Sequence, residues 1–221
     1  MSIADNLHFF QTQLAGTGCR LVTVTKTHPV DKLREAYDAG ARLFGENKVQ
    51  EMVAKQPELP TDIEWHLIGH LQTNKVKYVA PFVHTIQSID SLKLLQEIEK
   101  QAAKHDRVVR GLLQFHIADE ETKSGLSLAE AHEILRSESY QNLRHVQLTG
   151  VMGVATNTPD QDQLRREFRE LRGFFEELKA QYFAAQPEFR EISMGMSADY
   201  KLAIEEGSTL IRVGRAIFGA R

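Results

Sequence analysis

Cysteine is almost absent from this sequence, since Cys19 is the single example among 221 residues. A lone cysteine excludes an internal disulfide and favours a reducing compartment, where we expect it to be a buried structural thiol. An excess of basic residues is also missing, because 27 Lys and Arg stand against 30 Asp and Glu, for a net charge of −3. That balance gives no electrostatic reason to expect nucleic acid or an anionic membrane as a partner.

Long apolar runs are lacking too. No uninterrupted stretch approaches the roughly 18 residues of a membrane span. The N-terminus, MSIADNLHFFQTQL, has neither the basic region nor the apolar core of a signal peptide. With 42% hydrophobic and 26% charged residues, the composition is that of an ordinary globular protein. The sequence therefore predicts a soluble, cytoplasmic protein without a membrane partner.

What the sequence does contain is a repeated alternation of short apolar strands and helical patterns. Such alternation predicts a parallel sheet, and eight units are the number that closes a (β/α)₈ TIM barrel. An open, doubly wound sheet is the alternative fold. No linker or shift in composition divides the chain, so we expect residues 1–221 to form a single barrel domain with an extra N-terminal helix. The expected strands span residues 19–26, 41–47, 63–69, 83–89, 108–117, 145–152, 190–195 and 208–214.

The clearest helical pattern lies between the sixth and seventh expected strands. Residues 158–161 (TPDQ) combine a capping threonine, a proline at the first helical position and a glutamine three residues after the cap. A second helix is expected to begin with Ser197 as its cap, to run to Glu206 and to stop at Gly207. The helix that follows residues 158–161 has one apolar face, formed at three- and four-residue steps by Leu164, Phe168, Leu171, Phe175, Leu178 and Tyr182.

The first expected strand ends in a lysine. In LVTVTKTHP (21–29), the two-residue period of a strand places Val22, Val24 and Lys26 on one face. Functional residues of TIM barrels lie at the C-terminal ends of strands, which is the position of this lysine. If the valines face the barrel interior, burial disfavours the ammonium form and leaves a neutral amine for Schiff-base formation. From this segment alone, a lysine that reaches solvent is the simpler interpretation.

Two glycine-containing segments lie at the ends of the last two strands. SMGMS (193–197) precedes an expected helix, whose first backbone N–H groups can bind an anion. IRVGRAIFG (211–219) places Gly214 where backbone can approach a ligand closely. Each segment alone is equally well explained as a turn, but the loops after strands seven and eight of TIM barrels commonly hold phosphate. Together with the lysine they indicate pyridoxal 5′-phosphate, whose aldehyde needs an amine and whose phosphate needs N–H donors.

Five segments extend this interpretation to a family. They are VTKTHP (24–29), FGENKVQE (44–51), WHLIGHLQTNK (65–75), TKSG (122–125) and SMGMSADYKLAIEEGSTLIRVGRAIFG (193–219). With them, the chain resembles the YggS/PROSC family of pyridoxal-phosphate-binding proteins, also called PLP homeostasis proteins, from the first strand to the C-terminus. The resemblance implies a barrel like the N-terminal domain of bacterial alanine racemases, with pyridoxal phosphate as its cofactor.

The resemblance also implies which residues surround that cofactor. Lys26 would form the Schiff base (an internal aldimine), Asn47 would lie beside the cofactor, and Arg212 would face its pyridine nitrogen. A permanent guanidinium there keeps the nitrogen unprotonated and weakens the ring as an electron sink. The sequence departs from the family at His116, where asparagine is common, and in GVMGVATNTPD, where a methionine and two prolines are common. The residues implied around the phosphate are Ser193, Gly195, Ser197, Gly214 and Arg215.

The function implied by the resemblance is a non-catalytic one: the protein would hold pyridoxal phosphate and buffer or deliver it, affecting vitamin B6 and amino/keto-acid balance. Its expected partners are PLP-dependent apo-enzymes or regulatory proteins, and the chain is expected to be a monomer. Two alternatives stay open, a PLP-dependent enzyme such as an amino-acid racemase and a protein-interaction module that senses the cofactor. No metal is expected, because His66 and His70 span a strand end and a glycine without an HExxH pattern.

Overall fold

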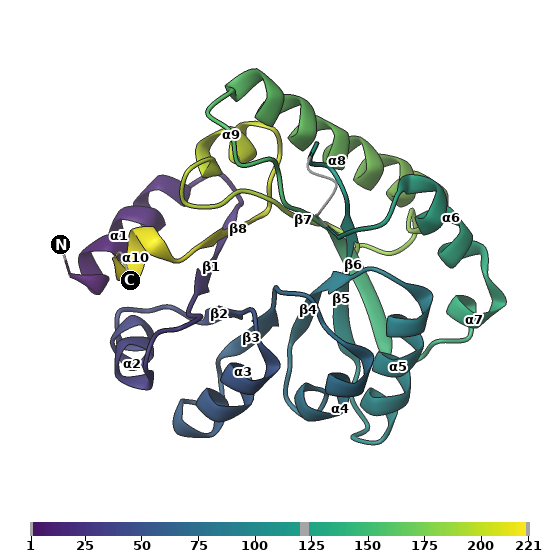
Figure 1. Cartoon of the computed structure of the whole chain (residues 1–221), viewed down its shortest axis with the longest axis horizontal. Helices are drawn as coiled ribbons and strands as arrows, with labels where there is room; N and C mark the ends of the chain where they lie inside the picture. The colour runs from purple at the N-terminus through teal and green to yellow at the C-terminus, as the bar shows by residue number, and fades with distance from the viewer. Residues whose placement is uncertain (1, 120–123, 220–221) are drawn as a thin grey trace.

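Eight parallel strands close into a barrel in sequence order, with the last strand paired to the first (Figure 1). The computed structural model describes residues 2–119 and 124–219, so Thr122 and Lys123 of the TKSG segment lie outside the described residues. The predicted barrel is confirmed and the open sheet is wrong. The strands are β1 (Arg20–Val24), β2 (Leu43–Glu46), β3 (Glu64–Leu67), β4 (Thr85–Ile89), β5 (Val109–Phe115), β6 (Val146–Gly153), β7 (Glu191–Ser193) and β8 (Leu210–Val213).

Helices surround the barrel on its outside (Figure 1). The expected N-terminal helix is α1, which begins with a capping box between Ser2 and Asp5. No described helix combines the length and apolar character needed to span a lipid bilayer. The helices are α1 (Ile3–Leu14), α2 (Val30–Asp38), α3 (Val49–Lys55), α4 (Val76–Val79), α5 (Leu92–Ala103), α6 (Leu128–Arg136), α7 (Glu138–Gln141), α8 (Gln161–Tyr182), α9 (Tyr200–Glu205) and α10 (Arg215–Phe218), with short 3₁₀ turns η1 (Gln56–Glu58) and η2 (Thr73–Lys75).

Two predicted helix starts are wrong by a few residues. Helix α8 is capped by Asp160, whose carboxylate accepts hydrogen bonds from two first-turn N–H groups, whereas Thr158 accepts from the N–H of Asp160 itself. Helix α9 begins at Tyr200, so Ser197 is not its cap. The reason is local, because the carboxylate of Asp199 accepts from the N–H of Met196 and closes a turn ahead of the helix.

The core has two layers. A small apolar cluster joins β1, β5, β6 and β8, and because β1 and β5 are not hydrogen-bonded neighbours, this contact crosses the barrel interior. The larger layer lies between strands and helices and includes Phe44, Trp65 and the buried face of α8. Cys19 belongs to it, and burial raises the pKa of its thiol to about 11, as suits a structural residue. The inner cluster consists of Val22, Leu112, Met152 and Leu210.

Candidate functional site

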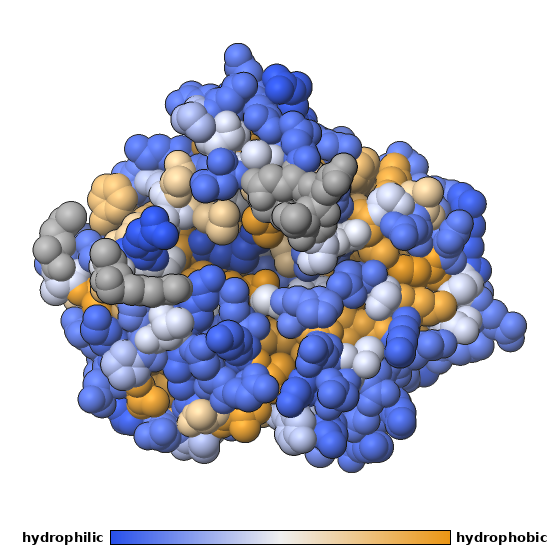
Figure 2. Space-filling view, in the orientation of Figure 1, coloured by the Kyte–Doolittle hydropathy of each residue, from blue (hydrophilic) through white to orange (hydrophobic). Residues whose placement is uncertain are grey.

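The C-terminal ends of the strands open on one face of the molecule, where Figure 2 shows a central hollow in a mostly hydrophilic surface. Lys26 lies at this face, two residues beyond the end of β1, and its side chain is half-buried. The residue after it, Thr27, has a φ of 67°, a left-handed conformation that turns the chain sharply. The neighbouring strand β8 pairs in register through Val22 and Arg212, so Lys26 and Gly214 follow adjacent strand ends.

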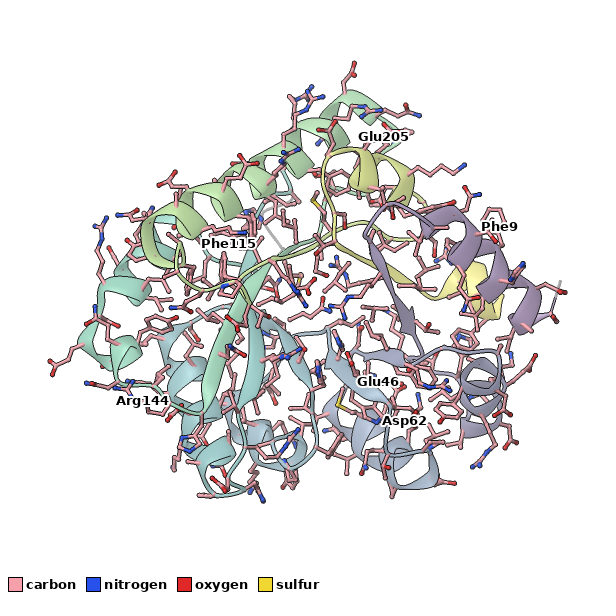
Figure 3. The ribbon with its side chains drawn as sticks, turned by 180° about the vertical axis from the view of Figure 1, so that it is seen from behind. Phe9, Glu46, Asp62, Phe115, Arg144 and Glu205 are labelled. Carbon is pink, nitrogen blue, oxygen red and sulfur yellow. The ribbon has the colours of Figure 1, made fainter. Side chains whose placement is uncertain are left out.

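A buried network holds the backbone on the N-terminal side of Lys26. The hydroxyl of Thr25 donates to Glu46 Oε1 over 2.7 Å, and Lys55 Nζ donates to the same oxygen over 2.7 Å and to the carbonyl of Thr25 over 2.9 Å. Figure 3 shows Glu46 in the middle of the molecule, and its side chain is fully buried. Burial raises the pKa of Glu46, while the hydrogen bonds from Lys55 and Thr25 oppose that shift.

The same network holds the C-terminal side of the turn. Glu51, on the first turn of α3, accepts from the N–H of Thr27 over 2.6 Å, and Lys55 Nζ lies 3.3 Å from the same carboxylate. Burial opposes ionisation of Glu51, but the Thr27 N–H and Lys55 outweigh it and lower the pKa of Glu51. Both neighbours of Lys26 are therefore fixed, one by Glu46 and the other by Glu51, and Lys55 joins the two.

A buried guanidinium lies between the strand ends and the middle of the barrel. Arg212 donates through Nη1 to Ser193 Oγ over 2.7 Å and through Nη2 to the carbonyl of Gly153 over 2.9 Å. The Ser193 hydroxyl in turn donates to Gln87 Oε1 over 2.6 Å. Burial lowers the pKa of Arg212 to about 10, so the side chain keeps its charge at neutral pH. The two bonds occupy two of its five N–H groups.

Two glycines allow the loops beside this guanidinium to pack closely. Gly195 has a φ of +95°, and a Cβ there would lie 2.6 Å from Ala203 Cβ. At Gly214 a Cβ would lie 2.9 Å from the carbonyl oxygen of Val24. The Gly195 carbonyl accepts from the N–H of Arg212, so the two segments lie side by side. Gly214 also precedes α10, where its carbonyl accepts from the N–H groups of Ile217 and Phe218, so that only those of Arg215 and Ala216 have no partner within the helix.

The remaining predicted site residues lie around the same opening, in different settings. Asn47 is the half-buried residue that follows β2, and Ser197 is half-buried in the turn before α9. Arg215 is exposed at the start of α10. Ser193 is fully buried with its hydroxyl engaged by Arg212 and Gln87, which places it beneath the opening as a support for the guanidinium.

Sequence reasoning missed the residues that connect these positions. Glu46 and Glu51 lie in the FGENKVQE segment, and the four-residue spacing from Glu51 to Lys55 is a signal that could have suggested their pairing. Gln87 gave no local signal. His66 and His70 do not come together: His66 lies inside the barrel in β3, whereas His70 follows the strand and pairs with Asp90 at 3.4 Å.

Comparison with known proteins first identifies a class. The family model described as alanine racemase, N-terminal domain, matches residues 1–221. The alanine racemase of Clostridium difficile superposes with a TM-score of 0.81 at 12% identity, over 100% of this chain and 60% of the racemase. The fold is therefore the alanine-racemase type of barrel.

Closer relatives identify the family within that class. The pyridoxal phosphate homeostasis protein of Aquifex aeolicus is 39% identical over 208 residues, which are 93% of this chain and 89% of the relative. That of Escherichia coli is 38% identical over 207 residues, 91% of this chain and 85% of the relative. PipY of Synechococcus elongatus superposes at 37% identity with TM-scores of 0.91 without PLP and 0.88 with PLP bound, over 99% of this chain and 100% of PipY. The chain belongs to the pyridoxal phosphate homeostasis protein family.

Proposed function

We propose that this protein binds pyridoxal 5′-phosphate reversibly through Lys26 and serves in its homeostasis, without turnover of its own. The observation that carries the proposal is the geometry at the strand ends. A rigidly held lysine follows β1, while a phosphate-compatible glycine segment follows the adjacent strand β8. The names of the relatives and the PLP bound to PipY support the same function.

The residues present fit this cofactor. Bound pyridoxal phosphate supplies an aldehyde that condenses with a primary amine and a phosphate that accepts N–H donors. Lys26 offers the amine, and Gly195 and Gly214 let the loops at the strand ends pack too closely for a Cβ on either residue. The N–H groups of Arg215 and Ala216, at the start of α10, have no partner within the helix and offer an anion two donors beside Gly214.

The remaining site residues take supporting roles in this proposal. Arg212 holds a positive charge toward an acceptor nitrogen, and Ser193 positions Arg212. Asn47 lies at the edge of the opening, while Ser197 and Arg215 stand beside the phosphate end.

Absence of turnover is the part of the proposal that depends on Arg212. Its guanidinium is held by Ser193 and the Gly153 carbonyl, and it keeps its proton at neutral pH. A group that donates a hydrogen bond but no proton leaves the ring nitrogen unprotonated, which opposes charge build-up during amino-acid chemistry. We propose that residues 1–221 act as one monomeric cytoplasmic unit that exchanges pyridoxal phosphate with PLP-dependent apo-enzymes or regulatory proteins.

The test is reduction with borohydride followed by peptide mapping. We expect the purified protein to show visible absorption with pyridoxal phosphate, and reduction to fix the cofactor on Lys26. Lys26→Ala should lose the adduct. Lys48→Ala is the matched control, because Lys48 is an exposed lysine at the same face, next to Asn47. An adduct of equal yield in Lys26→Ala, or one mapped to another lysine in the wild type, would sink the proposal.

A further inference from the structure

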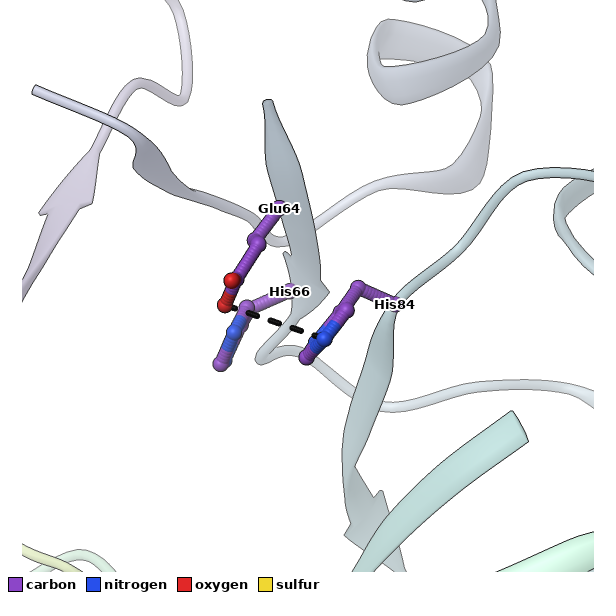
Figure 4. Close-up of side chains that lie close together, drawn as sticks. All are labelled: Glu64, His66 and His84. Carbon is purple, nitrogen blue, oxygen red and sulfur yellow. Dashed lines mark ion pairs between the residues drawn. The ribbon is translucent and has the colours of Figure 1, made fainter. Parts of the chain in front are cut away.

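A second group of polar side chains lies at the opposite end of the barrel from Lys26. Glu64 is the first residue of β3, His66 lies two residues further along the strand, and His84 immediately precedes β4. One ligand atom from each lies within 4.8 Å of the other two. Figure 4 shows the three side chains projecting to the same side of the two strands. Residues 2–119 and 124–219 contain no other such group of histidine, cysteine and carboxylate side chains.

Two atoms of this group are buried without a hydrogen-bond partner. His66 is only 2% exposed. Gln87 lies 2.8 Å from its ring nitrogen Nδ1, whereas the other ring nitrogen, Nε2, has no hydrogen-bond partner. Glu64 Oε2 is also buried without a hydrogen-bond partner, although it lies within ion-pair distance of His84 Nε2, at 3.7 Å. Buried polar atoms in proteins are nearly always paired, so two unsatisfied atoms in one cluster require an explanation.

We propose that Glu64, His66 and His84 form a binding site for a divalent transition-metal ion, with Zn²⁺ as the best fit. Two imidazole nitrogens and one carboxylate oxygen are a ligand set that Zn²⁺ takes in proteins, with water in the fourth position. Zn–N bonds of about 2.0–2.1 Å put tetrahedral ligand atoms about 3.3 Å apart. The three ligand atoms, which lie within 4.8 Å of one another, therefore have to approach by at most about 1.5 Å to surround an ion.

The space beside the cluster has the size that such an ion needs. A cavity of about 40 Å³ adjoins His66 and His84 and is also lined by Arg20, Arg110 and Arg190. A cavity needs roughly 10–15 Å³ of such volume to hold one water. The water that completes a zinc site therefore fits beside the cluster.

The side chains around the cluster carry charges of both signs. Arg20 and Arg110 lie near and oppose any cation, although Arg20 is paired with Glu191 at 2.8 Å. Because these arginines repel a cation, we expect cation binding to depend most on the carboxylate of Glu64.

The outer contact of His66 is also of the kind that metal-binding histidines make. A ring that binds metal through Nε2 carries its proton on Nδ1 and donates it to an acceptor. Gln87 lies in that place, but its amide nitrogen faces Nδ1 while its oxygen accepts from Ser193. An ion on Nε2 therefore requires the amide to turn, so that its oxygen accepts from His66 and its nitrogen donates to the Ser193 hydroxyl.

The experiment is metal titration of chelator-treated protein at a fixed cofactor occupancy. Calorimetry with Zn²⁺ is expected to show one ion bound per chain, and Co²⁺ is expected to give the intense visible bands of a four-coordinate site. Glu64→Gln and His84→Gln should each weaken Zn²⁺ binding at least tenfold, since loss of even an outer partner costs about 10–100-fold. His70→Gln is the matched control, because His70 pairs with a carboxylate at the other end of the barrel.

Wild-type protein that binds no stoichiometric Zn²⁺ at micromolar concentration would overturn the proposal. So would binding that persists unchanged in the Glu64→Gln, His84→Gln double variant. Thermal unfolding separates loss of Zn²⁺ binding from loss of the fold. Zn²⁺ should raise the Tm of the wild type and of His70→Gln, whereas Glu64→Gln should fold without a rise in Tm on addition of Zn²⁺. None of these readouts requires Lys26, so the result is separate from the proposal for pyridoxal phosphate.

Discussion

At the scale of single residues, the opening at the strand ends depends on positions where only glycine fits. Gly195 has a φ of +95°, and a Cβ added to it would lie closer to the Cβ of Ala203 than two real Cβ atoms approach. The sequence suggested this glycine as part of a phosphate loop. Its structural cause is the packing of the loop against α9, which no local pattern displays.

Replacement of this glycine by alanine is expected to destabilise the protein. Gly195→Ala adds a Cβ that would lie 2.6 Å from Ala203 Cβ in a strained backbone conformation, and such strain costs about 1–3 kcal/mol. Gly173→Ala is the control, because Gly173 lies within α8 with nothing within 4 Å of an added Cβ. That variant should gain about 0.5–1 kcal/mol from helix propensity. Urea unfolding measures both, and equal effects in the two variants would contradict this account of the loop.

The carboxylate of Glu51 makes the turn around Lys26 sensitive to acid. Its folded-state pKa is lowered by the Thr27 N–H and Lys55, so ionised Glu51 stabilises the fold. This stabilisation is complete above the unfolded pKa of about 4.3 and is lost as the pH falls through the lower folded value. The unfolding free energy of the wild type should therefore exceed that of Glu51→Gln at pH 7. The difference should shrink as the pH falls below about 4 and disappear once Glu51 is protonated in the folded protein, and a difference that acid leaves unchanged would contradict the assignment.

At the scale of elements, α3 and the ends of β1 and β2 form one unit through Lys55. Its ammonium is buried between Glu46 and Glu51, and it also reaches the carbonyl of Thr25. A buried ion pair is weak evidence for stability as such, but removing one partner leaves an uncompensated charge. The unit therefore serves to hold the turn of Lys26 in one conformation.

Lys55→Met is expected to loosen this unit. The change strands the carboxylate of Glu46, which is fully buried, and breaking a buried pair in this way costs about 3–5 kcal/mol. Lys48→Met is the control, because Lys48 is an exposed lysine that precedes the same helix. Chemical unfolding and the yield of the borohydride-reduced adduct are both expected to fall in Lys55→Met alone. A loss below about 1 kcal/mol, as surface pairs show, would mean that Lys55 does not hold the turn.

The elements also explain how far sequence reasoning reaches. Strand and helix alternation is a local signal, so it predicted all eight strands, although seven are shorter than the predicted segment and β6 is displaced by one residue. The position of Lys26 at a strand end follows from the same pattern. The clusters of Glu46 with Lys55, and of Glu64 with His84, could not be predicted. They join residues on neighbouring elements whose register is set when the barrel closes.

At the scale of the whole molecule, the barrel separates two ends with different chemistry. The C-terminal ends of the strands present Lys26 and the glycine segments, and the N-terminal ends present Glu64, His66 and His84. Hydrogen bonds from Arg212 through Ser193 and Gln87 to His66 cross the interior between them. The fold is shared with racemases, so the proposed absence of turnover has to come from the residues at the first end.

Racemisation needs acid–base groups on both faces of the reacting carbon, because one proton leaves and another arrives from the opposite side. Lys26 can serve one face. In the racemases that the sequence resembles, the second group is a tyrosine, and each tyrosine of this chain has another setting. Tyr37 donates to Asp62, Tyr182 is bonded to His132, Tyr200 packs on Phe10, burial raises the pKa of Tyr140 to about 12, and Tyr78 is exposed on α4.

We therefore expect no appreciable racemase activity from the chain. The measurement is deuterium exchange at the α-carbon of L- and D-alanine with chiral analysis of the products, in the wild type and in Lys26→Ala. Slow exchange without inversion agrees with a lysine that acts on one face alone. Arg212 opposes even that exchange, because its guanidinium keeps its proton at neutral pH. Turnover of about 1 s⁻¹, the low end for ordinary enzymes, that is lost in Lys26→Ala would replace the homeostasis proposal with an enzymatic function.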